Sequence, residues 1–217
     1  MDILSLFALD AYPPEAILSG HHEPGLAALS ILIAIAASAM ALQVGGLART
    51  APDRFARNFA VLSGAVALAG GIWAMHFVGM LALDVGIEVS YDRGLTAASA
   101  LPAFVAAWIA LRLFARRRIQ TRQLLIGGTA IGLGIGAMHY TGMAAMRMNA
   151  LLRLDASWFV ASIVVAVVFA VAALWIRFGP LSRHSIDETR AVMLGGVVMG
   201  LAISAMHYTG MAAAVFV

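Results

Sequence analysis

Six long apolar stretches alternate along the chain with short segments that hold most of its charged residues. Each stretch contains about 20 residues or more and almost no charge, which is the length that a helix needs to cross about 30 Å of hydrocarbon. The expected spans lie at about 26–47, 59–83, 95–115, 124–146, 158–178 and 191–215. The pattern predicts an all-α integral membrane protein with six transmembrane helices.

The arginines are distributed unevenly between the two ends of these spans. All 14 basic residues are arginine, and 11 of them follow the first, third and fifth spans. These are Arg49, Arg54, Arg57, Arg112, Arg116, Arg117, Arg118, Arg122, Arg177, Arg183 and Arg190, whereas only Arg93, Arg147 and Arg153 follow the second and fourth. Because cytoplasmic loops carry the arginine excess, we expect an extracytoplasmic N-terminus. The even-numbered spans then run outward.

One short motif occurs three times. AMHYTGMAA stands at 137–145 and at 205–213, and AMHFVGMLA stands at 74–82. An acid and a serine recur at matched positions before and within the odd spans, as Glu23, Asp92 and Asp155 and as Ser30, Ser99 and Ser162. The chain is therefore expected to be one domain, 1–217, built from three tandem two-helix repeats at about 22–90, 91–153 and 154–217. Parallel repeats predict pseudo-threefold symmetry about the membrane normal, with the small-residue-rich even spans inside.

The motif places an imidazole and thioethers together near the outer end of each even span. On a helix, the methionine four residues after the histidine lies about 40° from it, the preceding methionine about 100° away, and the glycine between them leaves a gap for a partner helix or a ligand. The candidate metal ligands are His76, His139 and His207 with Met75, Met80, Met138, Met143, Met206 and Met211. The simpler interpretation is that the methionines pack and that each histidine bonds a neighbouring polar group.

Imidazole combined with thioether suits copper, because soft thioethers favour Cu(I). Three imidazoles at one depth would also suit zinc or Cu(II). The chain has no cysteine, so thiolate ligands and disulfides are excluded. The chain has 62% apolar and only 12% charged residues, which is typical of a membrane protein. We therefore interpret the arginines as topology signals, since no nucleic-acid-binding motif accompanies them.

Other candidate residues each have a structural alternative. Tyr140 and Tyr208 follow their histidines, but Phe77 replaces tyrosine in the first copy, and an interfacial packing role is the alternative. His21 and His22 could complete a site or lie in a solvated tail. The acids Glu23, Asp92 and Asp155 either orient imidazoles as hydrogen-bond partners or cap the odd helices.

The chain resembles the bacterial MHYT domain, a membrane sensor module named after its Met-His-Tyr-Thr signature. The resemblance rests on the two AMHYTGMAA copies, on MHFVGM, and on the first span after GHHE; Phe77 and Val78 depart from the signature but leave His76 and both methionines intact. It implies a non-enzymatic sensor that binds copper through these residues and detects oxygen, carbon monoxide or nitric oxide. It also implies a cytoplasmic diguanylate cyclase, phosphodiesterase or kinase output domain in longer chains, which would require a seventh span.

Two other functions remain open from the sequence. A metal-ion or proton transporter would need polar residues through the full depth of the membrane, whereas the inner halves of the even spans are mostly Gly, Ala, Leu, Ile and Val. A haem protein that uses two of the histidines is the other, although no attachment motif supports it.

Overall fold

Long helices form most of the structure, and short strands join them at one end. The computed structural model describes residues 7, 12–116, 118–178 and 188–217, so Arg117 and Arg183 lie outside the described residues. The helices are α1 (Pro24–Thr50), α2 (Arg54–Leu81), α3 (Arg93–Ala98), α4 (Ala100–Phe114), α5 (Thr121–Ala144), α6 (Ala156–Phe178) and α7 (Glu188–Ala212). The strands are β1 (His21–His22), β2 (Leu83–Asp84), β3 (Ser90–Tyr91), β4 (Met146–Arg147), β5 (Leu152–Leu154) and β6 (Ala214–Phe216), and a 3-10 turn, η2, covers Pro14–Ala16.

The six expected spans are confirmed as helices that are long and apolar enough to cross a membrane. The third differs from the prediction because it is divided at Ser99 into α3 and α4. Pro102 explains the division, since it has no N–H to donate to the carbonyl of Ala98. The even helices also end earlier than expected, at Leu81, Ala144 and Ala212, and their last apolar residues continue as strands.

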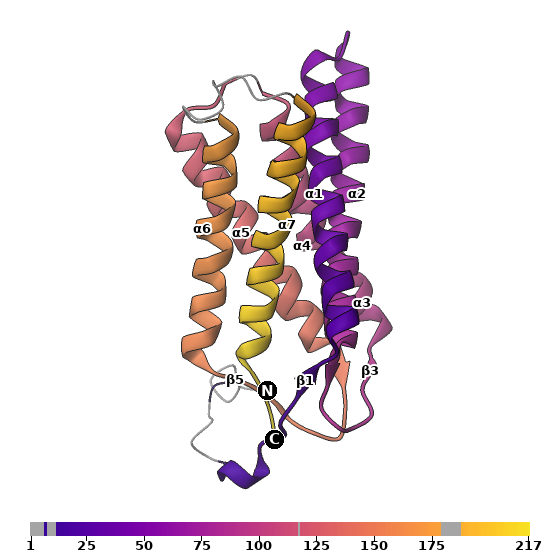
Figure 1. Ribbon diagram of the computed structural model, residues 1–217, viewed down its shortest axis with the longest axis vertical. Coiled ribbons are helices and arrows are strands. Elements are labelled where there is room, and N and C mark those ends of the chain that lie inside the picture. The colour runs from indigo at the N-terminus through magenta and orange to yellow at the C-terminus, as the bar shows by residue number, and fades with distance from the viewer. Residues whose placement is uncertain (1–6, 8–11, 117, 179–187) are drawn as a thin grey trace.

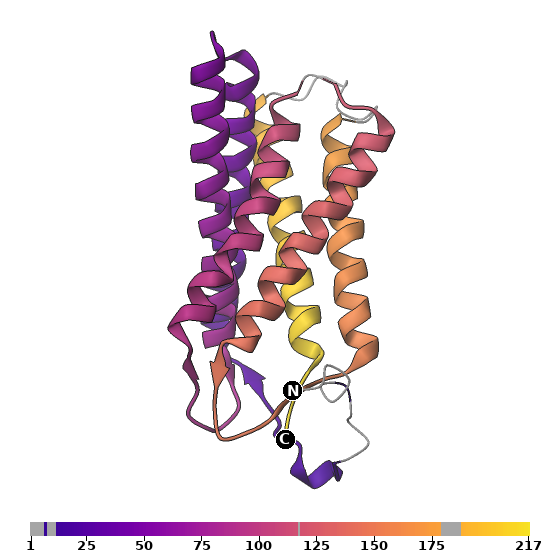
Figure 2. The same ribbon diagram turned by 180° about the vertical axis from the view of Figure 1, so that it is seen from behind.

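The helices form a closed ring in which α1 packs between α2 and α7, α4 between α2 and α5, and α6 between α5 and α7. Figures 1 and 2 show them running side by side, with the strands at one end and the helix connections at the other. The helices α2, α5 and α7 also meet one another in the centre, and each buries more of its length than α1 or α6. The even spans therefore form the inner layer. We call the end with the strands the strand end. The opposite end, where α1 ends at Thr50 and α2 begins at Arg54, is called the arginine end.

The strands pair in the same way within each sequence repeat. β1 pairs with β2, β3 with β4, and β5 with β6, all antiparallel. The residue just before each capping acid lies opposite the residue seven positions after the motif histidine in the same repeat: His22 opposite Leu83, Tyr91 opposite Met146, and Leu154 opposite Ala214. This equivalence is what tandem repeats require, while the threefold axis itself stays a prediction.

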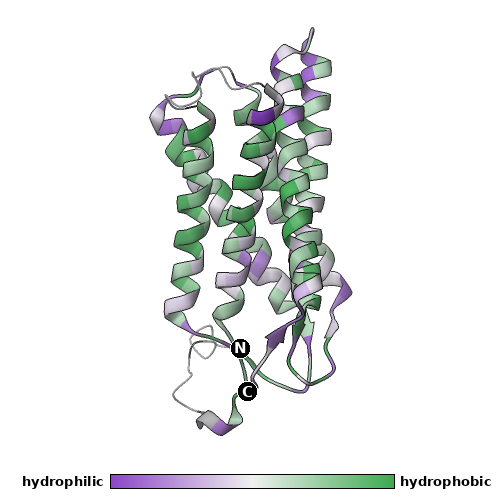
Figure 3. Cartoon of the chain, viewed as in Figure 1, coloured by the Kyte–Doolittle hydropathy of each residue, from purple (hydrophilic) through white to green (hydrophobic). Residues whose placement is uncertain are grey.

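The outer surface of the helices is apolar along most of its length, as the green bands of Figure 3 show, and polar colour gathers toward the ends. Large side chains such as Leu32, Leu62, Leu101 and Val164 are more than half exposed. Exposed apolar rows of this length are stable only against lipid. The structure and the composition together describe a multi-pass membrane protein.

Replacing the cap of α6 should destabilise the fold measurably. Oδ1 of Asp155 accepts a hydrogen bond of 3.0 Å from the backbone N–H of Trp158. Loss of an N-cap costs about 1 kcal/mol, so Asp155→Ala should lower the melting temperature of the purified protein by about 2–4 °C. Asp155→Asn keeps a capping oxygen and serves as the control. Equal melting temperatures for the Ala and Asn variants would contradict the capping role.

Candidate metal centre

The three motif histidines lie inside the bundle at one level. His76 on α2, His139 on α5 and His207 on α7 each stand five residues before the last residue of their helix. All three side chains are at most 1% exposed. Matched positions on three parallel helices place equivalent side chains at equal depth, and the three histidines accordingly lie together near the strand end.

The imidazoles converge through their Nδ1 atoms. Nδ1 of His76 lies 3.1 Å from that of His207 and 3.2 Å from that of His139, and the remaining pair is 3.3 Å apart. The rings stand nearly perpendicular to one another, with interplanar angles of 78–86°. Among the described residues, these three form a group that could hold a metal ion.

This arrangement is hard to satisfy with hydrogen bonds alone. A neutral imidazole carries one proton, on either Nδ1 or Nε2. Three protons on Nδ1 would collide in the centre, whereas protons on Nε2 leave three converging lone pairs. None of the three buried Nε2 atoms has a hydrogen-bond partner of good geometry in the described part of the chain. An ion bound through Nδ1 would not change the Nε2 atoms, so it is the three converging Nδ1 atoms that give the cluster the properties of a ligand set.

The spacing of the nitrogens also fits an ion. Three nitrogen ligands at about 2.0–2.1 Å from a tetrahedral metal lie about 3.3–3.4 Å from one another. The observed separations of 3.1–3.3 Å need only a slight expansion to reach this value. Because all donors are nitrogen and no carboxylate belongs to the group, three neutral imidazoles would meet the ion without neutralising its charge.

The motif glycines make this convergence possible. A Cβ atom on Gly79 would collide with Nε2 of His207, one on Gly142 with Nε2 of His76, and one on Gly210 with Nε2 of His139. Each histidine therefore packs against the glycine of another repeat, and the three contacts close a ring. The gap that the sequence indicated beside each histidine is occupied by a partner imidazole.

The six candidate methionines are buried in two separate layers. Met75, Met138 and Met206 belong to the long apolar core that extends toward the arginine end. Met80, Met143 and Met211 belong to a second cluster, together with Val85 just after β2, Leu154 of β5 and Phe216 of β6. The histidines thus lie between two layers of thioethers. The side chains that surround the site on both sides are therefore mainly apolar.

The two motif tyrosines bind the serines of neighbouring repeats. The hydroxyl of Tyr140 lies 2.6 Å from Oγ of Ser162, and that of Tyr208 lies 2.7 Å from Oγ of Ser30. Each tyrosine ring also meets its adjacent histidine ring edge-on, with centroids 4.9 and 4.8 Å apart. These contacts connect the histidine level of an even helix to the odd helix of the next repeat.

The first repeat makes the equivalent contact with a different residue. Phe77 has no hydroxyl, and there Nε1 of Trp73 donates to Oγ of Ser99 over 3.1 Å and to the carbonyl of Thr96 over 3.0 Å. The sequence analysis missed Trp73. The available signal was that tryptophan stands three residues before the histidine only in the copy that lacks tyrosine, where the other copies have Gly136 and Ser204.

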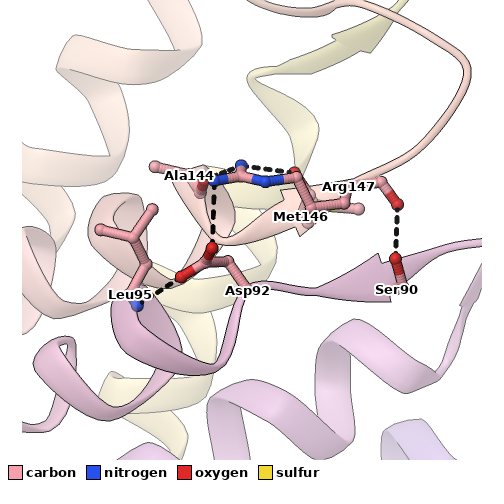
Figure 4. A network of polar contacts seen from close by, with 6 residues as sticks. All are labelled: Ser90, Asp92, Leu95, Ala144, Met146 and Arg147. Carbon is pink, nitrogen blue, oxygen red and sulfur yellow. Dashed lines mark hydrogen bonds and ion pairs between the residues drawn. The ribbon is translucent and has the colours of Figure 1, made fainter.

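The acidic residues of the repeats cap helices. Glu23 accepts bonds from the N–H groups of Gly25 and Leu26, and these bonds lower the pKa of its carboxyl group. Asp92 accepts from Leu95 and also lies 3.5 Å from the guanidinium of Arg147, which in turn donates to the carbonyl of Ala144 (Figure 4). These contacts are those of the capping alternative, and a role in orienting the imidazoles stays a prediction.

His21 and His22 form β1 at the strand end, outside the buried triad. His21 is exposed, and its Nε2 is 3.9 Å from the carboxylate of Asp84. The ring of His22 meets the ring of Tyr208 at a centroid distance of 5.4 Å. Partial burial lowers the pKa of His22, and the neighbouring His21 lowers it further. His22 therefore contacts the ring of Tyr208 at the strand end and is not a member of the triad.

Comparison with known proteins agrees with the motif analysis. The family model described as MHYT, bacterial signalling protein N terminal repeat, matches residues 70–127 and 132–186. The chain belongs to this MHYT family. Both matched ranges begin a few residues before a motif histidine, so they contain the buried sites of His76 and His139. No solved structure matches the chain.

Several curated relatives of this MHYT domain are signalling proteins. The bifunctional diguanylate cyclase/cyclic di-GMP phosphodiesterase MucR of Pseudomonas aeruginosa is 44% identical over 92% of this chain and 29% of its own length. The cyclic di-GMP phosphodiesterase NbdA of the same organism is 37% identical over 89% of this chain and 24% of its own length. The signaling protein YkoW of Bacillus subtilis is 31% identical over 88% and 24%, respectively. The chain thus spans less than a third of the length of each of these relatives.

Adding one methyl group at a motif glycine should disrupt the triad. Gly142→Ala places a Cβ against Nε2 of His76, and overpacking of this kind costs about 1–3 kcal/mol. We expect a melting temperature several degrees lower. Gly70→Ala on α2 is the control, because nothing lies within 4 Å of its Cβ position and alanine is the better helix former. An unchanged melting temperature for Gly142→Ala would show that the histidines do not pack against the glycines.

Proposed function

We propose that this MHYT domain is a non-enzymatic membrane sensor whose three buried histidines bind one copper ion. The observation that carries the proposal is the convergence of three Nδ1 atoms within 3.1–3.3 Å of one another in a fully buried, apolar layer. In this proposal His76, His139 and His207 are the ligands, with protons on their Nε2 atoms. The adjacent methionine layers supply additional thioether donors to a soft ion.

Copper fits this environment better than zinc for an electrostatic reason. The group of candidate ligands contains no anion, so the charge of the ion remains uncompensated in a membrane interior. The cost of burying an ion rises with the square of its charge, and a divalent ion therefore costs about four times as much as a monovalent one. Cu(I) is monovalent, binds imidazole and thioether, and is stabilised where water is excluded.

Signalling requires that the site prefers one arrangement of the helices. Reduced copper with three nitrogen ligands supplies a centre that binds diatomic molecules such as carbon monoxide or oxygen. In this proposal, a change at the histidines is passed from the even to the odd helices by three hydrogen bonds. These join Tyr140 to Ser162, Tyr208 to Ser30 and Trp73 to Ser99. A shift of an even helix at the histidine level would move the odd helix bonded to it, and this helix continues to the arginine end. We propose that a cytoplasmic cyclase or phosphodiesterase output domain, as named for MucR and NbdA, reads this shift.

The structure favours neither alternative function. Between the histidines and the arginine end lies an apolar cavity of about 50 Å³, lined by aliphatic, Ala, Phe and Met side chains including Ile72, Ile135 and Ile203. Apolar cavities of this kind stay dry and offer no relay for ions or protons. Two axial histidines of a haem need the porphyrin between them, whereas these Nδ1 atoms already lie within 3.3 Å of one another.

Metal analysis of the purified protein tests the shared site. After repletion with copper and zinc, we expect about one copper ion per chain, because the three nitrogens form a single ligand set. His76→Ala, His139→Ala and His207→Ala should each abolish binding to the same extent. His21→Ala removes an exposed histidine and is the control that should retain copper. Metal-free wild-type protein would refute the metal proposal, and retention of zinc instead of copper would refute the choice of metal.

Gas binding can be examined by infrared spectroscopy on the reduced, copper-loaded protein. Addition of carbon monoxide should produce one C–O stretching band that shifts with ¹³CO and disappears in His139→Ala. His21→Ala should show the same band as the wild type. Copper-loaded protein without such a band would exclude the gas-binding part of the proposal and leave metal binding intact.

A further inference from the structure

A basic pocket lies at the arginine end, between α2 and α4. Its volume is about 240 Å³, and it is lined by Arg57, Asn58 and Val61 from α2, by Arg112 from α4, and by Ala115 and Arg116 just after the end of α4. Half of these residues are arginines, and none of the described lining residues is acidic. It is at the opposite end of the bundle from the strands, on the side where positively charged loops predict the cytoplasm.

Within the described residues, no carboxylate lies at ion-pair distance from the three guanidinium groups. The ion pairs found among the described residues join Arg147 to Asp92 and His21 to Asp84, both at the strand end. Arg112 instead lies over the ring of Trp108, 4.6 Å from its centroid, which fixes the guanidinium by a cation–π contact. Arginine forks bind phosphate oxygens in pairs, so the pocket is complementary to a phosphate group.

An apolar row on α4 leads away from this pocket. Leu101, Val105 and Trp108 are 66%, 52% and 38% exposed. They follow one another at spacings of four and three residues, and Arg112 continues the row four residues beyond Trp108, whereas Arg116 follows the end of the helix at Phe114. Side chains at these spacings share one helix face. The face is therefore apolar within the membrane and basic at its end, with an interfacial tryptophan between the two parts.

We propose that this pocket binds the headgroup phosphate of an anionic phospholipid, with an acyl chain lying along Leu101, Val105 and Trp108. A soluble phosphate compound would share the contacts to Arg57, Arg112 and Arg116 but would have no use for the apolar row. The lipid would contact α2 of the first repeat and α4 of the second together. Since α2 carries His76, the site would stabilise the arginine end of a helix whose other end holds the triad.

Quenching of tryptophan fluorescence by brominated lipid tests the proposal. The whole chain is placed in phosphatidylcholine vesicles that contain a minor fraction of phosphatidylglycerol with brominated acyl chains. We expect stronger quenching than with the same fraction of brominated phosphatidylcholine, because the anionic lipid is enriched at Trp108. Trp108→Phe should remove this excess. Arg57→Gln with Arg112→Gln should weaken the apparent affinity about fivefold for each arginine removed.

The control is Arg118→Gln with Arg122→Gln, which removes the same charge at the same end but outside the pocket. This variant should keep the excess quenching. An equal loss in both double variants would show attraction to general surface charge and overturn the proposal, as would equal quenching by the two brominated lipids. Displacement by inorganic phosphate would assign the pocket to a soluble ligand instead. Copper content, measured on the same samples, depends on the histidines and distinguishes failure of this proposal from failure of the metal site.

Discussion

The structure depends on the meeting of three buried imidazoles at one point inside the helix bundle. Each ring needs space, and the space comes from a glycine on a neighbouring even helix. Hydrocarbon offers no polar partner, and among the described residues the Nδ1 atoms face one another, so an ion between them is the other way to satisfy these atoms. One constraint, the packing of each imidazole against a glycine of a neighbouring helix, therefore sets how closely the three helices approach and how each ring is oriented.

Two further sets of contacts hold the histidine layer in place. Paired strands and capping carboxylates close the strand end, and the backbone bond from Asp92 N–H to the carbonyl of Ala145 has counterparts from Glu23 to Ala82 and from Asp155 to Ala213. Below them, Tyr140 and Tyr208 join the motif helices to the neighbouring odd helices. The odd helices are more exposed to lipid than the even ones, but these hydrogen bonds connect them to the even helices at the depth of the histidines.

The two ends of the molecule have opposite chemistry. At the strand end, Arg147 forms an ion pair with Asp92 (Figure 4). At the arginine end, three arginines line a pocket beside an apolar helix face, and none of them forms an ion pair with a described carboxylate. A sensor of this design would have a desolvated centre near one membrane surface and a lipid-responsive surface near the other, with α2 extending to both.

The sequence by itself determined the six spans, the inner position of the even helices and the gathering of His76, His139 and His207, because hydropathy and repetition leave few other ways to bury these residues. It did not determine the strands, since apolar residues at the end of a helix resemble more helix, or the break at Ser99. Only the tertiary structure decided that Nδ1 faces the centre and that Trp73 replaces the missing tyrosine. Ring orientation and partner choice depend on contacts between residues far apart in the chain, and the order of residues along it carries no direct record of them.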